Sequence, residues 1–153
     1  IEDVKEDLRE DLEHKHIDIE IDEICEVNVI PFQFRQLIYN LVSNSIKFSK
    51  ADIPLIIKIK CKIAKGEALK NKMLSPEIEY CYICISDNGI GFDQEYSKKI
   101  FELFQRLHGR SEYAGTGIGL AIVKKIVENH NGIIIAKGKP NIGATFDIYF
   151  PMT

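Results

Sequence analysis

The amino-acid sequence predicts an α+β fold, a two-layer α/β sandwich in which a mixed, mostly antiparallel sheet packs on about three helices. Two observations support this prediction. Several runs alternate apolar with polar residues or are rich in β-branched and aromatic residues, and both patterns are typical of strands. Apolar residues at helical spacing occur between these runs. The predicted strands cover residues 17–21, 56–63, 80–86, 133–137 and 144–150, and the predicted main helices cover residues 31–47, 96–107 and 119–129.

Length and composition predict one globular domain over residues 1–153, because the chain is 45% hydrophobic and 28% charged. A net charge of -3 provides no broad cationic field, so we expect no nucleic-acid partner and no direct membrane contact. No apolar run approaches the roughly 20 residues that span a bilayer. The chain starts at Ile1 rather than Met. We therefore expect a cytoplasmic piece of a longer protein, whose other parts are free to include a membrane anchor.

The first residues predict a short connecting helix over residues 1–15, where Val4, Leu8 and Leu12 form a narrow apolar stripe among charged residues. The four cysteines of the chain are too sparse for a disulfide scaffold and fit a reducing compartment. Cys81 and Cys84 have the C-x-x-C spacing of redox and zinc sites. On a strand, an odd separation points them to opposite faces, so we predict a structural role for both.

The helix over residues 31–47 carries a polar stripe beside its apolar face. Pro31 suits the first turn, and Asn40, Asn44 and Lys47 follow one another along one side. Asparagine is a mediocre helix former, so two aligned with a lysine indicate a role beyond local stability. An asparagine oxygen is a hard ligand for Mg²⁺, and a lysine is a point charge for phosphate. A merely solvated polar face is the alternative.

Two glycine groups frame the middle of the chain. The first, Asp87-Asn88-Gly89-Ile90-Gly91-Phe92, follows the strand 80–86, so that a carboxylate stands where glycines let the backbone approach a flat ligand. The second, Gly115-Thr116-Gly117-Ile118-Gly119-Leu120, opens a helix, whose unpaired N–H groups and positive dipole end attract phosphate. Together they predict a nucleotide site, with the base at one group and the phosphates at the other.

These glycine groups, taken with Asn40-Leu41-Val42-Ser43-Asn44-Ser45-Ile46-Lys47-Phe48, resemble the motifs of the catalytic and ATP-binding domain of bacterial sensor histidine kinases. That family belongs to a superfamily with the gyrase, Hsp90 and MutL ATPase domains. The resemblance covers about residues 17–151 and implies the Bergerat-type ATP-binding fold. It also implies an F box and ATP lid over residues 92–116, and it places the phosphoacceptor dimerisation domain outside this sequence.

The resemblance implies ATP and Mg²⁺ as cofactors and assigns roles to individual residues. Asp87 would accept a hydrogen bond from the adenine amine, and Asn44 would hold Mg²⁺. Asn40, Lys47 and Arg106 would act on the phosphoryl group, and Asn40 replaces the glutamate with which hydrolytic relatives activate water. The full nucleotide-binding set expected from the family is Asn44, Asp87, Gly89, Gly91, Phe104, Gly115, Thr116, Gly117, Gly119, Leu120 and Thr145.

The family's partners are a histidine on a separate dimerisation domain of the same kinase and, downstream, the receiver domain of a response regulator. Two other functions remain open from the sequence. One is a serine protein kinase of the anti-sigma type, which shares these motifs, and the other is a nucleotide-sensing module that binds ATP without transferring phosphate. A dinucleotide-binding site is disfavoured because Leu120 occupies the sixth position of G-x-G-x-x-G, and no P-loop G-K-[ST] exists.

Overall fold

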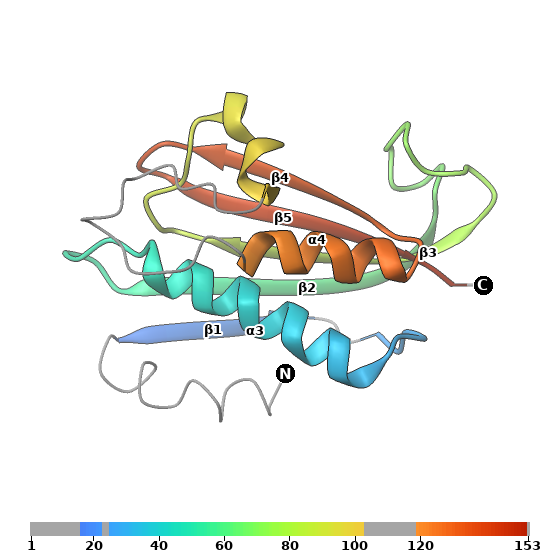
Figure 1. Cartoon of the computed structure of the whole chain (residues 1–153), viewed down its shortest axis with the longest axis horizontal. Coiled ribbons are helices and arrows are strands. Elements are labelled where there is room, and N and C mark those ends of the chain that lie inside the picture. Colours follow the sequence, from blue (N-terminus) through green and yellow to red (C-terminus); the bar gives the residue numbers. More distant parts are fainter. Residues whose placement is uncertain (1–15, 23–24, 103–118, 153) are drawn as a thin grey trace.

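The computed structural model describes residues 16–22, 25–102 and 119–152. These residues form one five-stranded sheet with the order β1-β2-β3-β5-β4, and two α-helices lie against it (Figure 1). β1 runs parallel to β2, and every other pair is antiparallel. The prediction of a mixed, mostly antiparallel sheet in a two-layer sandwich is confirmed. The elements are β1 Ile17–Asp22, α3 Pro31–Lys47, β2 Leu55–Lys65, β3 Glu79–Asp87, α4 Gly119–Asn129, β4 Ile133–Lys139 and β5 Gly143–Pro151.

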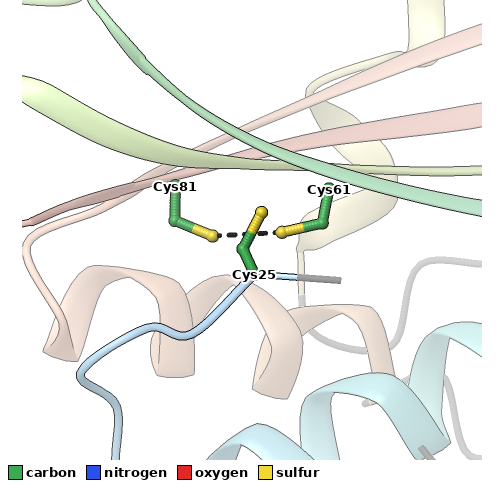
Figure 2. A group of neighbouring side chains, drawn as sticks. All are labelled: Cys25, Cys61 and Cys81. Atoms are coloured by element: carbon green, nitrogen blue, oxygen red, sulfur yellow. Dashed lines mark hydrogen bonds between the residues drawn. The ribbon is translucent and has the colours of Figure 1, made fainter. Parts of the chain in front are cut away.

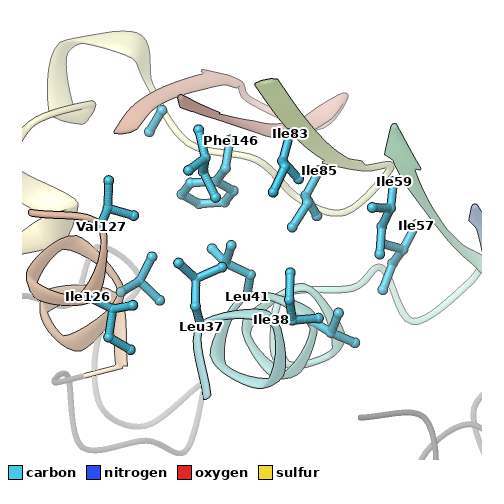
Figure 3. Close-up of a cluster of buried hydrophobic side chains, with 14 of the residues drawn as sticks. Leu37, Ile38, Leu41, Ile57, Ile59, Ile83, Ile85, Ile126, Val127 and Phe146 are labelled. Atoms are coloured by element: carbon cyan, nitrogen blue, oxygen red, sulfur yellow. The ribbon is translucent and has the colours of Figure 1, made fainter. Parts of the chain in front are cut away.

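Helix α3, with 17 residues, is the longer of the two described α-helices that pack on the sheet. Pro31 occupies the first turn, where its missing N–H removes no helical hydrogen bond. The apolar face of α3 packs on the strands through a core that Figure 3 shows between the two layers. This packing orients the polar stripe of α3 along a different side of the helix. The core residues of α3 are Leu37, Ile38, Leu41, Val42 and Ile46, and they meet Ile57, Ile59, Ile83, Ile85 and Phe146 of the sheet.

Helix α4 packs beside α3 and ends as the sequence predicts. Asn131 adopts a φ of 58° and the Gly132 N–H donates to the Val127 carbonyl over 2.9 Å, which terminates the helix. His130 Nε2 accepts a hydrogen bond from the Ile30 N–H at 3.0 Å, so its Nδ1 is the protonated nitrogen that donates to Ile126 O at 2.8 Å. The imidazole therefore ties the end of α4 to the start of α3.

The helix predicted over residues 96–107 does not form in its described part. Residues up to 102 instead form two short 3₁₀ helices, Gln94–Tyr96 and Lys99–Phe101. The Asp93 side chain accepts from the Glu95 N–H, and Gln94 Oε1 accepts from the Gly138 N–H of β4 at 3.0 Å. The segment is therefore held against the sheet edge in separate single turns, which is the usual use of 3₁₀ geometry. Residues 103–107, and the connecting helix expected over residues 1–15, lie outside the described residues.

The two faces of the sheet carry different side chains: the face toward the helices is apolar, and the other face includes a buried aspartate with polar partners. Cys81 is fully buried in the helix-facing core, whereas Cys84 lies directly opposite Asp147 of β5 on the other face. The prediction that Cys81 and Cys84 point to opposite faces is confirmed. On that other face Asp147 is buried, and it accepts from the Tyr82 hydroxyl at 2.5 Å and from Lys137 Nζ at 3.0 Å. Among the described helices, none is both long and apolar enough to cross a membrane.

Candidate nucleotide site

Asp87 ends β3 and is held by three different parts of the fold. Its Oδ2 accepts a hydrogen bond from the hydroxyl of Ser45 on α3 at 2.7 Å. Its Oδ1 accepts from the N–H of Gly89 at 2.9 Å and from the N–H of Ala144 on β5 at 3.3 Å. A carboxylate oxygen accepts about two hydrogen bonds. The position of Asp87 is therefore set by the protein, while Oδ2 keeps the capacity to accept one more donor.

Burial raises the pKa of Asp87 above its ordinary value, although the hydrogen bonds from Gly89, Ser45 and Ala144 each lower that pKa. Desolvation is the larger effect, as expected for a carboxylate with little access to water. A hydrogen-bond acceptor with so little access to water discriminates strongly between ligand groups that donate and ligand groups that accept. Placing a second acceptor against it without a hydrogen bond costs about 1–3 kcal/mol. Asp87 therefore has the surroundings of a recognition group rather than of a surface charge.

The Ser45 hydrogen bond brings the end of β3 to the part of α3 that carries the polar stripe. Asn40 and Asn44 are partly buried, and Lys47 is exposed in the last turn. Asn40 Nδ2 is buried and has no hydrogen-bond partner among the described residues. Because buried donors are rarely left unpaired, this atom fits an acceptor supplied from outside, such as a phosphate oxygen or a bound water. The stripe and the carboxylate thus belong to one region of the surface.

Gly89 and Gly91 allow close packing of the loop against the protein's own backbone. A Cβ at Gly89 would lie 2.6 Å from the carbonyl oxygen of Phe48, at the end of α3. A Cβ at Gly91, which has a φ of +65°, would lie 2.2 Å from the carbonyl oxygen of Lys139. Both glycines thus place the loop that carries Asp87 between α3 and the β4–β5 turn. The close approach of this backbone to a ligand stays a prediction.

Thr145 is not brought together with Asp87. Its neighbours Ala144 and Phe146 pack on the helix-facing core, so strand alternation puts Thr145 on the opposite face of the sheet. The strand residue that does contact Asp87 is Ala144, through its N–H. The role of Thr145 in nucleotide binding therefore rests on the resemblance alone and stays a prediction.

The second glycine group is described only at its end. Gly119 is the first residue of α4, and a Cβ added there would meet no atom of the described structure within 4 Å. Leu120 is partly buried and packs against the main core. The other predicted site residues, namely Phe104, Arg106, Gly115, Thr116 and Gly117, lie outside the described residues, as does most of the predicted F box and lid.

Ser45 and Gly143 are two parts of the site to which the sequence alone assigned no role. Ser45 is buried among the apolar residues of α3, and its place on the apolar face, one turn after Leu41, is the signal that the sequence offers. Gly143 has a φ of +151°, and a Cβ there would lie 2.0 Å from the backbone oxygen of Asp87. That contact joins strands far apart in sequence, so no local pattern could have predicted it.

Comparison with known proteins agrees with this geometry. Residues 30–153 match the family model described as "Histidine kinase-, DNA gyrase B-, and HSP90-like ATPase". The phytochrome-like protein Cph1 of Synechocystis sp. is 36% identical over 146 residues, which are 95% of this chain and 18% of that protein. The sensor histidine kinase TmoS of Ectopseudomonas mendocina is 33% identical over 139 residues, which are 90% of this chain and 12% of that protein.

Among solved structures, full-length ShkA in complex with AMPPNP superposes with a TM-score of 0.74 at 21% identity, covering 99% of this chain and 29% of that one. This likeness shows the fold. The chain spans less than a fifth of the length of Cph1 and of TmoS. The family model, by contrast, covers most of the chain and includes α3, the end of β3 and the start of α4. The chain therefore belongs to the family of histidine kinase-, DNA gyrase B- and HSP90-like ATPases, and its sequence relatives include sensor histidine kinases.

Proposed function

We propose that this chain is the catalytic domain of a sensor histidine kinase, which binds magnesium ATP and transfers the γ-phosphoryl group to a histidine on a separate dimerisation domain. The observation that carries the proposal is the 2.7 Å hydrogen bond from Ser45 to Asp87. It joins an acceptor for the base to the helix that presents two asparagines and a lysine. AMPPNP, the nucleotide in the ShkA complex, is an ATP analogue and supports the choice of ligand.

Asp87 would select adenine over guanine. The exocyclic amine of adenine can donate to the remaining acceptor position on Oδ2, which already accepts from Ser45. Guanine presents a carbonyl oxygen at the corresponding place, so that two acceptors would face each other. The expected penalty for guanine is about 1–3 kcal/mol, or roughly 5- to 150-fold in affinity.

The polar stripe of α3 would hold the phosphates and the metal ion. Asn44 offers a neutral oxygen of the kind that Mg²⁺ accepts, and phosphate oxygens and waters would fill the other positions. A magnesium ion held there would neutralise charge on the transferring phosphoryl group. Lys47 would add a cation, and the buried Asn40 Nδ2 would donate to a phosphate oxygen or to a water.

Asn40 also indicates what kind of reaction the site supports. An amide cannot take a proton from water, so this helix position supplies no general base for hydrolysis. The domain would therefore position ATP for a nucleophile that comes from elsewhere. When that nucleophile is a histidine, one of its nitrogens bonds to the γ-phosphorus, the bond to the bridging oxygen breaks, and ADP leaves. The phosphohistidine would then donate its phosphoryl group to the receiver domain of a response regulator.

The proposal is tested by incubating the chain with γ-labelled ATP and the histidine-containing dimerisation domain of its parent protein. We expect label on that domain which is lost in acid and kept in alkali, as phosphohistidine chemistry requires. Label that survives acid would indicate a serine kinase of the anti-sigma type instead. ATP binding without any transfer, in the presence of that domain, would identify a nucleotide-sensing module.

Replacing the expected magnesium ligand gives a separate prediction. Asn44→Ala should weaken ATP binding in the presence of Mg²⁺ by about 10- to 150-fold, because a hydrogen-bonding or ligand contact to a charged group contributes about 1.5–3 kcal/mol. Binding in excess chelator should change little. Calorimetry with and without Mg²⁺ measures both values. Asn129→Ala is the matched control, since Asn129 is the last residue of α4 and its side chain donates a long, 3.5 Å hydrogen bond to the exposed side of the protein, at Gln33 Oε1. Equal losses with and without Mg²⁺ would rule out the metal role of Asn44.

A further inference from the structure

Three of the four cysteines meet at one place in the fold, away from the nucleotide site. Cys61 lies on β2, Cys81 lies on β3, and Cys25 lies on the segment that follows β1. Their side chains point toward one another from the sheet and from that segment (Figure 2). All three Sγ atoms lie within 4.8 Å of one another, and the Cys61 and Cys81 Sγ atoms are 3.4 Å apart.

The strand register argues against a disulfide between the two strand cysteines. Cys61 pairs with Ile83, and Cys81 pairs with Ile63, so the two cysteines are diagonal neighbours rather than partners. Diagonal residues have Cβ atoms separated by up to about 7 Å, whereas a disulfide needs about 3.5–4.5 Å. A bond between them would have to distort the β2–β3 ladder well inside its length.

The same spacing suits a metal ion between the sulfurs. A zinc-type ion binds thiolate sulfur at about 2.3 Å, which places the sulfurs of a three- or four-coordinate site roughly 3.7–4.0 Å apart. The Cys61–Cys81 distance of 3.4 Å lies just below that range, and the upper limit of 4.8 Å for the distances to Cys25 Sγ lies above it. Cys61 and Cys81 lie on neighbouring strands of a regular β-ladder. Their backbone is therefore already ordered before an ion binds.

The donor set determines which ions are suitable. All three atoms are sulfurs, and no carboxylate or imidazole belongs to the cluster among the described residues. Thiolates select soft ions such as zinc, cadmium and monovalent copper over magnesium or calcium. Cys81 is fully buried, whereas Cys25 and Cys61 are half-buried and leave a route from solvent.

We propose that Cys25, Cys61 and Cys81 form a binding site for one soft, thiol-seeking metal ion. Burial raises the pKa of both Cys61 and Cys81, so these groups enter the site as thiols. A divalent ion replaces the three thiol protons, which leave to solvent, and the resulting trithiolate unit carries one negative charge. Cys81 and Asp87 lie at opposite ends of β3, about 20 Å apart along the strand. The site is therefore separate from the nucleotide site.

The test is a titration of the chain with Cd²⁺, with the cysteines kept reduced by a phosphine. We expect an ultraviolet sulfur-to-cadmium charge-transfer band that saturates at one equivalent, together with a rise in Tm, since an ion that binds the folded state stabilises it. A band that never saturates, or saturation without a rise in Tm, would overturn the proposal.

Single substitutions assign the ligands. Cys25→Ser and Cys61→Ser should each abolish the charge-transfer band at one equivalent of Cd²⁺ and the rise in Tm. Two variants are used so that the test still stands if one of them does not fold. Cys84→Ser is the matched control and should keep both, because Cys84 lies on the other face of β3. All three variants should bind ATP as the unsubstituted chain does. An unchanged band in Cys25→Ser would contradict the three-sulfur site.

Discussion

Asp87→Asn is expected to abolish measurable ATP binding while the domain stays folded. The amide keeps an oxygen for the N–H groups of Gly89 and Ala144, and the Ser45 hydroxyl can rotate to accept from the new NH₂ group. Toward the adenine amine, however, the variant presents a donor where an acceptor is needed. Loss of one charged hydrogen bond and the donor–donor clash together cost about 3–5 kcal/mol, or roughly two to four orders of magnitude in affinity. Isothermal calorimetry measures the change.

The stability of this variant provides a second check. Burial raises the pKa of Asp87 in the folded chain above its value in the unfolded chain. The stabilisation that comes from this shift is fully present below the unfolded pKa and is lost as the pH rises through the folded pKa. At neutral pH the ionised carboxylate therefore opposes folding, and a neutral amide removes that cost. We expect Asp87→Asn to unfold at a urea midpoint no lower than that of the unsubstituted chain.

Asp147→Asn is the matched control for Asp87→Asn. Asp147 is likewise an aspartate of the sheet. It is fully buried, whereas Asp87 is partly buried, and it contacts Lys137 and Tyr82 on the face away from the helices. This substitution should lower the urea midpoint, because it breaks an ion pair whose acid is buried, and it should leave ATP affinity unchanged. Near-normal ATP affinity in Asp87→Asn would refute the adenine assignment.

Gly91→Ala is expected to destabilise the domain by about 2–5 kcal/mol, a large share of the roughly 5–15 kcal/mol typical of domains. The left-handed φ of +65° costs a residue with a Cβ about 1–2 kcal/mol. The Cβ would also lie 2.2 Å from the Lys139 oxygen and 2.6 Å from the Gly143 oxygen, and such overpacking typically adds about 1–3 kcal/mol. Urea unfolding followed by circular dichroism measures the loss.

Gly119→Ala is the control for that substitution. A Cβ at Gly119 meets no described atom within 4 Å, and Gly119 begins α4, where alanine is the better helix former. The control should leave the free energy of unfolding unchanged or raise it by up to about 1 kcal/mol. If Gly91→Ala were as stable as Gly119→Ala, the close packing of the Asp87 loop against the β4–β5 turn would be wrong.

The candidate site was predictable where its residues are neighbours in sequence or repeat with the period of a helix. Asp87 at the end of a strand, and the polar stripe of α3, are local features of this kind. Thr145 shows the limit, because the resemblance includes it in the nucleotide-binding set whereas strand alternation places it on the face of the sheet opposite to Ala144 and Phe146. The 3₁₀ turns before residue 102 show a second limit of prediction from sequence. A hydrogen bond from the Gly138 N–H to the Gln94 side chain, between residues far apart in sequence, holds that segment to β4.

The sequence by itself determined the fold class, the strands, the two helices α3 and α4, and the family, because periodicity and short motifs are properties of neighbouring residues. Only the tertiary structure decided which distant residues meet. It joined Cys81 to Cys25 and Cys61, which are far from it in sequence. It also joined Ser45 to Asp87. The physical reason is that strand pairing and helix packing bring residues together by register and face, and neither is written in any local stretch of sequence.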